Sequence, residues 1–133
     1  MKIVTLAMLS LAPQTAPTPL PTSIESPLAG DWTVDLTPKP GDPAYTKPMH
    51  LTLLSDGSVT GQFYQSDIEA GRWKTARGRT CVSFRTSDGQ GAYHTAACLV
   101  GDQVEGQTWA EARSFLFPWN AVRSDPSTPP IVP

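Results

Sequence analysis

The chain has 133 residues, a formal net charge of −2 and a hydrophobic fraction of 39%, which suit a single folded domain. The slight acidity excludes the strongly basic surface on which nucleic-acid-binding proteins depend, so no nucleic-acid partner is expected. Most of the 14 prolines cluster near the two ends and at 38–48, which marks these stretches as lying outside a core.

The first residues, Met1–Ala12, carry one lysine, an apolar run and small residues at the end of that run. This is the pattern of a secretory signal peptide, which we expect over residues 1–16, with the cleavage position left open. The run is shorter than the roughly 20 apolar residues that a membrane-spanning helix needs, so no membrane span is expected. Residues 17–28 then form a Pro-rich linker, and the location is predicted to be secreted or periplasmic.

Residues 29–123 are the expected folded domain, and residues 124–133 a Pro-rich disordered tail. Within the domain, short runs alternate apolar and polar residues between tight-turn signals such as Asp56-Gly57, and no helix is expected. Eight such runs predict eight strands. Their inward-facing residues, in chain order, are Trp32, Val34, Leu36; Met49, Leu51, Leu53; Val59, Gly61, Phe63; Trp73; Val82, Phe84; Tyr93, Thr95, Ala97, Leu99; Val104, Gly106, Thr108; Phe115, Phe117, Trp119 and Ala121.

Consecutive short strands joined by tight turns predict an all-β fold, an antiparallel meander of about eight strands. An open meander leaves two exposed edges, and closure into a β-barrel removes them. Eight strands is also the count at which the barrel interior is filled by side chains or holds one small ligand. A two-sheet β-sandwich is the alternative architecture.

The two cysteines flank one of these turns. Runs Cys81–Thr86 and Ala92–Leu99 surround a loop that contains Asp88-Gly89, a dipeptide typical of hairpin turns. With Thr86 opposite Tyr93, Cys81 lies directly opposite Cys98, at a Cα separation of about 4.5–5.5 Å that a disulfide can bridge. The sequence therefore predicts a Cys81–Cys98 disulfide and an oxidising compartment.

Gly30-Asp31-Trp32 opens the first strand, and Trp119-Asn120-Ala121-Val122-Arg123 closes the last. This arrangement resembles the calycin pattern of lipocalins and avidins, in which Gly-x-Trp begins the barrel. In lipocalins a basic residue of the final strand packs over that tryptophan. The resemblance therefore implies a barrel in which Arg123 has a structural role against the Trp32 ring. It implies no binding site, because no ligand-binding set can be matched residue by residue.

Catalytic and cofactor motifs are missing from the sequence. It contains no nucleophile elbow, phosphate loop or metal-ligand cluster, so no cofactor and no metal site are expected. His94 is the best single catalytic candidate, but the hairpin register places it opposite Arg85 on the outer face. His50 alternates with apolar neighbours and is expected to be an exposed strand residue. The cations between Arg72 and Arg85 are interpreted as the solvated side of adjacent strands.

The aromatic residues favour a binding protein. We expect an exported, non-enzymatic barrel that holds a small apolar or amphipathic ligand in or near its mouth. The predicted ligand-binding residues are Trp32, Phe63, Trp73, Tyr93, Phe117 and Trp119. The alternative is a protein-interaction module, such as an inhibitor of an exported enzyme or an envelope assembly factor. An enzyme with a cleft that joins His94 to a carboxylate is the third hypothesis.

Overall fold

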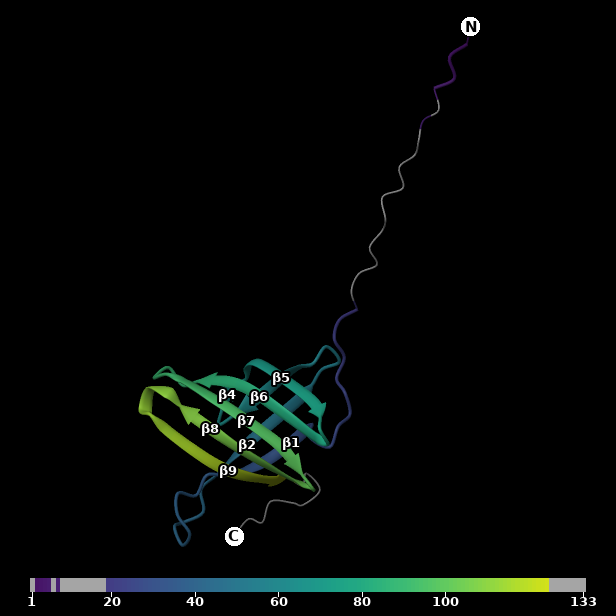
Figure 1. Cartoon of the computed structure of the whole chain (residues 1–133). Helices are drawn as coiled ribbons and strands as arrows, with labels where there is room; N and C mark the ends of the chain where they lie inside the picture. The colour runs from purple at the N-terminus through teal and green to yellow at the C-terminus, as the bar shows by residue number, and fades with distance from the viewer. Residues whose placement is uncertain (1, 6, 8–18, 125–133) are drawn as a thin grey trace.

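The computed structural model describes residues 2–5, 7 and 19–124, and places nine strands and one short 3-10 helix among them (Figure 1). The elements are β1 (Gly30–Asp35), β2 (Thr46–Leu53), β3 (Ser58–Phe63), β4 (Ser66–Asp67), β5 (Glu69–Ala76), β6 (Arg79–Ser87), β7 (Ala92–Val100), β8 (Gln103–Ala110), η1 (Glu111–Arg113) and β9 (Phe115–Arg123).

The strands form one antiparallel sheet that closes on itself (Figure 1). Neighbours follow the order β2-β1-β9-β8-β7-β6-β5-β3-β4, and an additional β2–β3 pairing joins the ends, so eight strands make the barrel wall. This confirms the closed barrel over the two-sheet sandwich. Strand β4 pairs with β3 alone and was not predicted, because two polar residues give no alternating pattern.

The β6–β7 hairpin has the predicted register. Thr86 lies opposite Tyr93 and Cys81 opposite Cys98, and the two cysteines form a disulfide with a Cα separation of 4.0 Å. Strand β6 continues through Ser87, so the loop is shorter than the five residues expected. The disulfide lies on the outer wall, because Val82 and the residues that alternate with it face the core.

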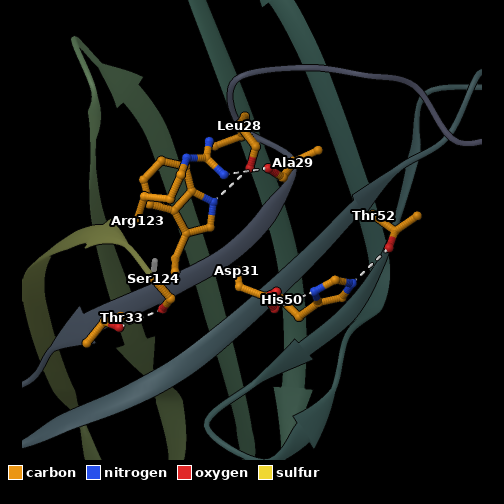
Figure 2. Close-up of polar contacts among 9 residues, drawn as sticks. Leu28, Ala29, Asp31, Thr33, His50, Thr52, Arg123 and Ser124 are labelled. Atoms are coloured by element: carbon orange, nitrogen blue, oxygen red, sulfur yellow. Dashed lines mark hydrogen bonds and ion pairs between the residues drawn. The ribbon is translucent and has the colours of Figure 1, made fainter. Parts of the chain in front are cut away.

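The barrel interior is packed at the end where β1 begins. Trp32 is fully buried, and its indole N–H donates to the carbonyl oxygen of Leu28 at 2.8 Å. The guanidinium of Arg123 lies 4.4 Å from the centre of the Trp32 ring, in the place that the calycin resemblance implied. It also donates to the carbonyl of Ala29 (Figure 2). A further donation to the carbonyl of Pro27 ties β9 to the segment before β1. We call this end of the barrel the closed end.

The folded part begins upstream of Ala29, where the sequence placed its start. Leu28 is fully buried in the core. The amide of Ile24 donates to Leu53 at 2.7 Å, and the carbonyl of Thr22 accepts from Ser55 at 2.8 Å. The last part of the expected 17–28 linker is therefore a strap across the closed end, because it supplies the apolar side chain that covers the core there.

Most of the expected signal peptide over 1–16, and the expected tail over 124–133 apart from Ser124, lie outside the described residues. Over the described part of the chain, no helix has the length and apolar character to cross a membrane.

Candidate functional site

The end of the barrel opposite the strap holds a cavity of about 280 Å³. It forms where β3, β6 and β8 end and where β7 and β9 begin. The loop that joins β1 to β2 also contributes to it. Its lining residues are Leu36, Tyr45, Phe63, Tyr64, Ser66, Thr86, Asp88, Tyr93, Thr108, Ala110, Arg113, Phe115 and Phe117. We call this cavity the mouth pocket.

Six of the thirteen residues that line the pocket are aromatic. Phe63 is buried and stacks on Trp119, with ring centres 5.5 Å apart and an interplanar angle of 30°. Phe63 also contacts Phe84 at 5.7 Å, and Phe117 lies 5.7 Å from Phe115 across the start of β9. Stacked and tilted ring pairs of this kind hold each other in place, so the walls are preformed.

Threonine hydroxyls lie beneath these walls. The Thr108 hydroxyl accepts the indole N–H of Trp119 at 3.0 Å and shares a hydrogen bond with the Thr95 hydroxyl at 2.9 Å. Thr86 is also buried, and both it and Thr108 line the pocket. This network fixes the Trp119 ring, because an indole N–H left without a partner inside the barrel would be costly.

One side of the rim is a tyrosine pair. The hydroxyls of Tyr45 and Tyr64 are hydrogen-bonded to each other, and the ammonium of Lys47 lies 5.2 and 5.1 Å from the two ring centres. Tyr64 has a φ of +52° and lies in the turn between β3 and β4. The hydrogen bond with Tyr45 raises the pKa of Tyr64, so its hydroxyl stays protonated at neutral pH.

Three polar side chains form the other side of the rim. The Tyr93 hydroxyl donates to Asp88 at 2.7 Å, and Arg113 of η1 approaches the same carboxylate at 3.8 Å. The hydrogen bond from Tyr93, together with the backbone amide of Gln90, lowers the pKa of Asp88. The same hydrogen bond raises the pKa of Tyr93. The rim therefore carries a carboxylate, a guanidinium and a neutral phenol at neutral pH.

The six predicted ligand-binding residues lie at two different ends of the barrel. Phe63, Tyr93 and Phe117 line the mouth pocket, and Trp119 lies directly beneath it. Trp32 and Trp73 lie at the closed end, where each indole N–H donates to a carbonyl of the chain, at Leu28 and Leu54 respectively. Alternation along a strand predicts which side chains face inward, but it does not predict the end of the barrel to which they belong.

Several pocket residues were not singled out from the sequence. Tyr45 stands in the Pro-rich stretch before β2, which composition had marked as lying outside the core. Arg113 follows β8 in a short 3-10 helix, where no strand alternation could indicate its direction. Their positions between strands could have indicated both residues, because the turns at one end of a barrel border the same opening.

The two inward-facing glycines do not enlarge the pocket. A Cβ on Gly106 would lie 2.6 Å from Cζ2 of Trp119, so the indole already occupies that space. Gly61 has a φ of +136°, and a Cβ there would lie 1.9 Å from the carbonyl oxygen of His50. Gly61 is therefore a bend of the wall at which two strands approach closely.

Both histidines lie on the outer wall. His94 is exposed opposite Arg85, as expected, and its Nε2 lies 3.2 Å from the carboxylate of Glu111. The ring of His50 lies between Asp31, at 2.7 Å from Nδ1, and Thr52, at 3.3 Å from Nε2 (Figure 2). None of these side chains lines the mouth pocket. Among the described residues, no group of three or more His, Cys, Asp or Glu side chains could hold a metal ion.

Comparison of the chain with protein-family models, with curated proteins and with solved structures found no match. The closed eight-stranded barrel is consistent with a calycin-like architecture, and functional conclusions depend on the geometry of the mouth pocket.

Proposed function

We propose that this protein is an exported, non-enzymatic β-barrel that binds a small apolar or amphipathic molecule in the mouth pocket. The observation that carries the proposal is a preformed cavity of about 280 Å³ at one end of the barrel, to whose lining six aromatic residues contribute. Small-molecule sites are typically concave and mostly apolar, with a few polar groups that fix orientation. This volume is just below the usual range of about 300–1,000 Å³ for small-molecule sites, so the ligand is compact, with a few rings at most.

The rigidity of the site supports binding over chemistry. Phe63 and Trp119 are buried and stacked, and the indole is held by Thr108, so the walls need little ordering when a ligand enters. The histidine that could act as a general base, His94, lies on the outer wall and does not line the pocket. A protein of this kind would hold, carry or sequester its ligand without changing it.

The proposal is tested by titrating the protein with N-phenylnaphthylamine, an uncharged probe whose fluorescence rises in an apolar site. Ala110 is buried and lines the pocket, so Ala110→Leu places three additional carbon atoms in the cavity. We expect this variant to bind the probe at least about tenfold more weakly, because the space is no longer available.

The matched control is Ala96→Leu, which makes the same change at an exposed position on the outer wall of β7. This control should bind the probe as the wild-type chain does. Equal binding by Ala110→Leu and the wild-type chain, or no binding by either, would refute the proposed function.

A protein-interaction role is the second candidate, and one observation favours it. Trp109 and Leu116 are direct neighbours on the outer wall of β8 and β9, and they are 40% and 52% exposed. Adjacent exposed apolar side chains of this size are typical of contact surfaces. Replacing both by Ser should leave the protein folded. Under this hypothesis the change abolishes capture of a partner from the exported fraction, and retained capture would exclude this surface.

Export is part of the proposal and is supported by the Cys81–Cys98 disulfide, since disulfides persist in oxidising compartments. Mass analysis of the protein isolated from its source, after alkylation of free thiols, tests it. Two alkylated cysteines would contradict export to such a compartment.

A further inference from the structure

The rim of the mouth pocket carries charged side chains, in a chain whose net charge is −2. Arg113 and Asp88 are the charged residues among those that line the pocket. Lys47 stands on the other side of the rim, with its ammonium 5.2 Å from the ring centre of Tyr45. The charges of Arg113 and Asp88 cancel in sum, and the carboxylate of Glu111 in η1 is paired on the outer wall. The ammonium of Lys47 therefore adds a positive charge near the entrance, which favours an anionic group on an entering molecule.

The single carboxylate is already engaged by its neighbours. Oδ2 of Asp88 accepts the Tyr93 hydroxyl at 2.7 Å, and Oδ1 accepts the backbone amide of Gln90 at 3.0 Å. Asp88 therefore holds the Tyr93 ring and the loop after β6 in place. These neutral donors stabilise the ionised carboxylate without removing its charge, and they occupy both of its oxygens, so Arg113 is left with a contact at 3.8 Å.

Arg113 is incompletely paired. Its Nη2 lies 3.8 Å from Oδ2 of Asp88 and 3.4 Å from the side-chain oxygen of Gln90. A guanidinium in a well-formed pair with a carboxylate has contacts of about 2.7–2.9 Å, often two of them in parallel. With a side chain 58% exposed, Arg113 therefore has donors available at the entrance.

We infer that the mouth pocket selects amphipathic anions. The apolar, ring-shaped body lies between the aromatic walls, and a carboxylate, sulfonate or phosphate group meets Arg113 at the rim. This inference rests on the proposed function and specifies the chemistry of its ligand. Two oxygens of such a group match the guanidinium fork, which presents several N–H donors in one plane.

Other ligand classes fit this entrance less well. A cationic molecule would meet Arg113 and Lys47 as it enters, and like charges repel. A neutral molecule would cover part of Arg113 without offering an acceptor, so the guanidinium would lose water and gain nothing in return. An anion avoids both costs.

The test uses two probes that share one aromatic body. N-phenylnaphthylamine is uncharged, and anilinonaphthalene sulfonate is the same body with a sulfonate. We expect the sulfonate to bind the wild-type protein about tenfold more tightly than the neutral probe, which corresponds to about 1.4 kcal/mol. This advantage should shrink when the salt concentration is raised, since the contact is partly exposed.

Arg113→Gln removes the charge and retains a polar side chain, and Arg113→Lys retains the charge without the fork. We expect Arg113→Gln to weaken sulfonate binding about tenfold and to leave the neutral probe within about twofold, while Arg113→Lys falls between. Arg79→Gln is the matched control, because Arg79 is exposed at the closed end of the barrel. It should leave both probes unaffected.

The outcomes separate this inference from the proposed function. If neither probe binds, the proposed function fails and the inference fails with it. If both probes bind equally to the wild-type chain and to Arg113→Gln, the function stands and the inference is wrong. The inference would also be overturned if Arg79→Gln weakened sulfonate binding as much as Arg113→Gln does. Loss of binding of both probes in Arg113→Gln would overturn it as well.

Discussion

Replacing Gly106 by Ala tests whether the Trp119 ring occupies the space that this glycine leaves in the barrel. An added Cβ would lie 2.6 Å from Cζ2 and 2.7 Å from Cη2 of the indole, and 2.9 Å from Cβ of Ala97. Real Cβ atoms do not approach other atoms so closely, so the ring must move. Trp119 cannot move freely, because it is hydrogen-bonded to Thr108 and stacked on Phe63.

Forcing an extra carbon into a filled core costs about 1–3 kcal/mol. For a domain of about 100 residues this lowers Tm by about 5–15 °C. Urea unfolding followed by tryptophan fluorescence gives the free energy of unfolding and its denaturant slope. We expect a lower midpoint at an unchanged slope, because the variant keeps the same fold.

The second half of the test is the same substitution in a Trp119→Phe background. Phenylalanine lacks the two indole carbons that the new Cβ would strike, so Gly106→Ala should cost less there, with a coupling of about 1 kcal/mol or more. Equal costs in the two backgrounds, or an unchanged midpoint in the single variant, would refute the view that the indole fills this space.

Three further changes have distinct expected outcomes. Replacing Cys81 and Cys98 together by Ala should lower the free energy of unfolding by about 3 kcal/mol, since the disulfide joins residues with a sequence separation of 17; an unchanged urea midpoint would contradict this. Asp88 has a folded pKa below its ordinary value of 3.8, so its contribution to stability is present at neutral pH and is lost as the pH falls through that lowered pKa. Tyr93→Phe removes the largest cause, so the NMR titration of Asp88 should move upward and the acid loss of stability should become smaller; an unmoved titration would exclude the hydrogen bond. Arg123→Gln should lower the free energy of unfolding by about 1–2 kcal/mol through loss of the cation–π contact and the carbonyl contacts, and unfolding at the wild-type midpoint would show that these contacts do not stabilise the closed end.

Much of the wall could be predicted because each strand faces solvent on one side and the core on the other. In the β6–β7 hairpin, alternation and one Asp-Gly turn were sufficient to place Cys81 against Cys98. The opposite orientations of His94 and Thr95 followed from the same register, with His94 exposed and Thr95 buried. A one-residue slip would have reversed every side chain, so the register is strongly specified.

The mouth pocket was only partly predictable, because its residues come from segments without a period. Tyr45 and Arg113 lie in a loop and a short 3-10 helix, where direction depends on tertiary contacts. Leu28 shows the same effect at the closed end, since proline-rich composition suggested a solvated linker and the structure buries its side chain completely. Strand alternation does not predict the burial of residues that lie outside strands and cover the end of a barrel.

The most direct test of the account is amide chemical-shift mapping of the full chain with N-phenylnaphthylamine. The account predicts that the largest shifts occur around the mouth pocket, at residues such as Phe63, Tyr93 and Phe117. Trp32 and Trp73, at the closed end, should remain unshifted. Shifts confined to the closed end, or no shifts at saturating probe, would contradict a binding site at the mouth of this barrel.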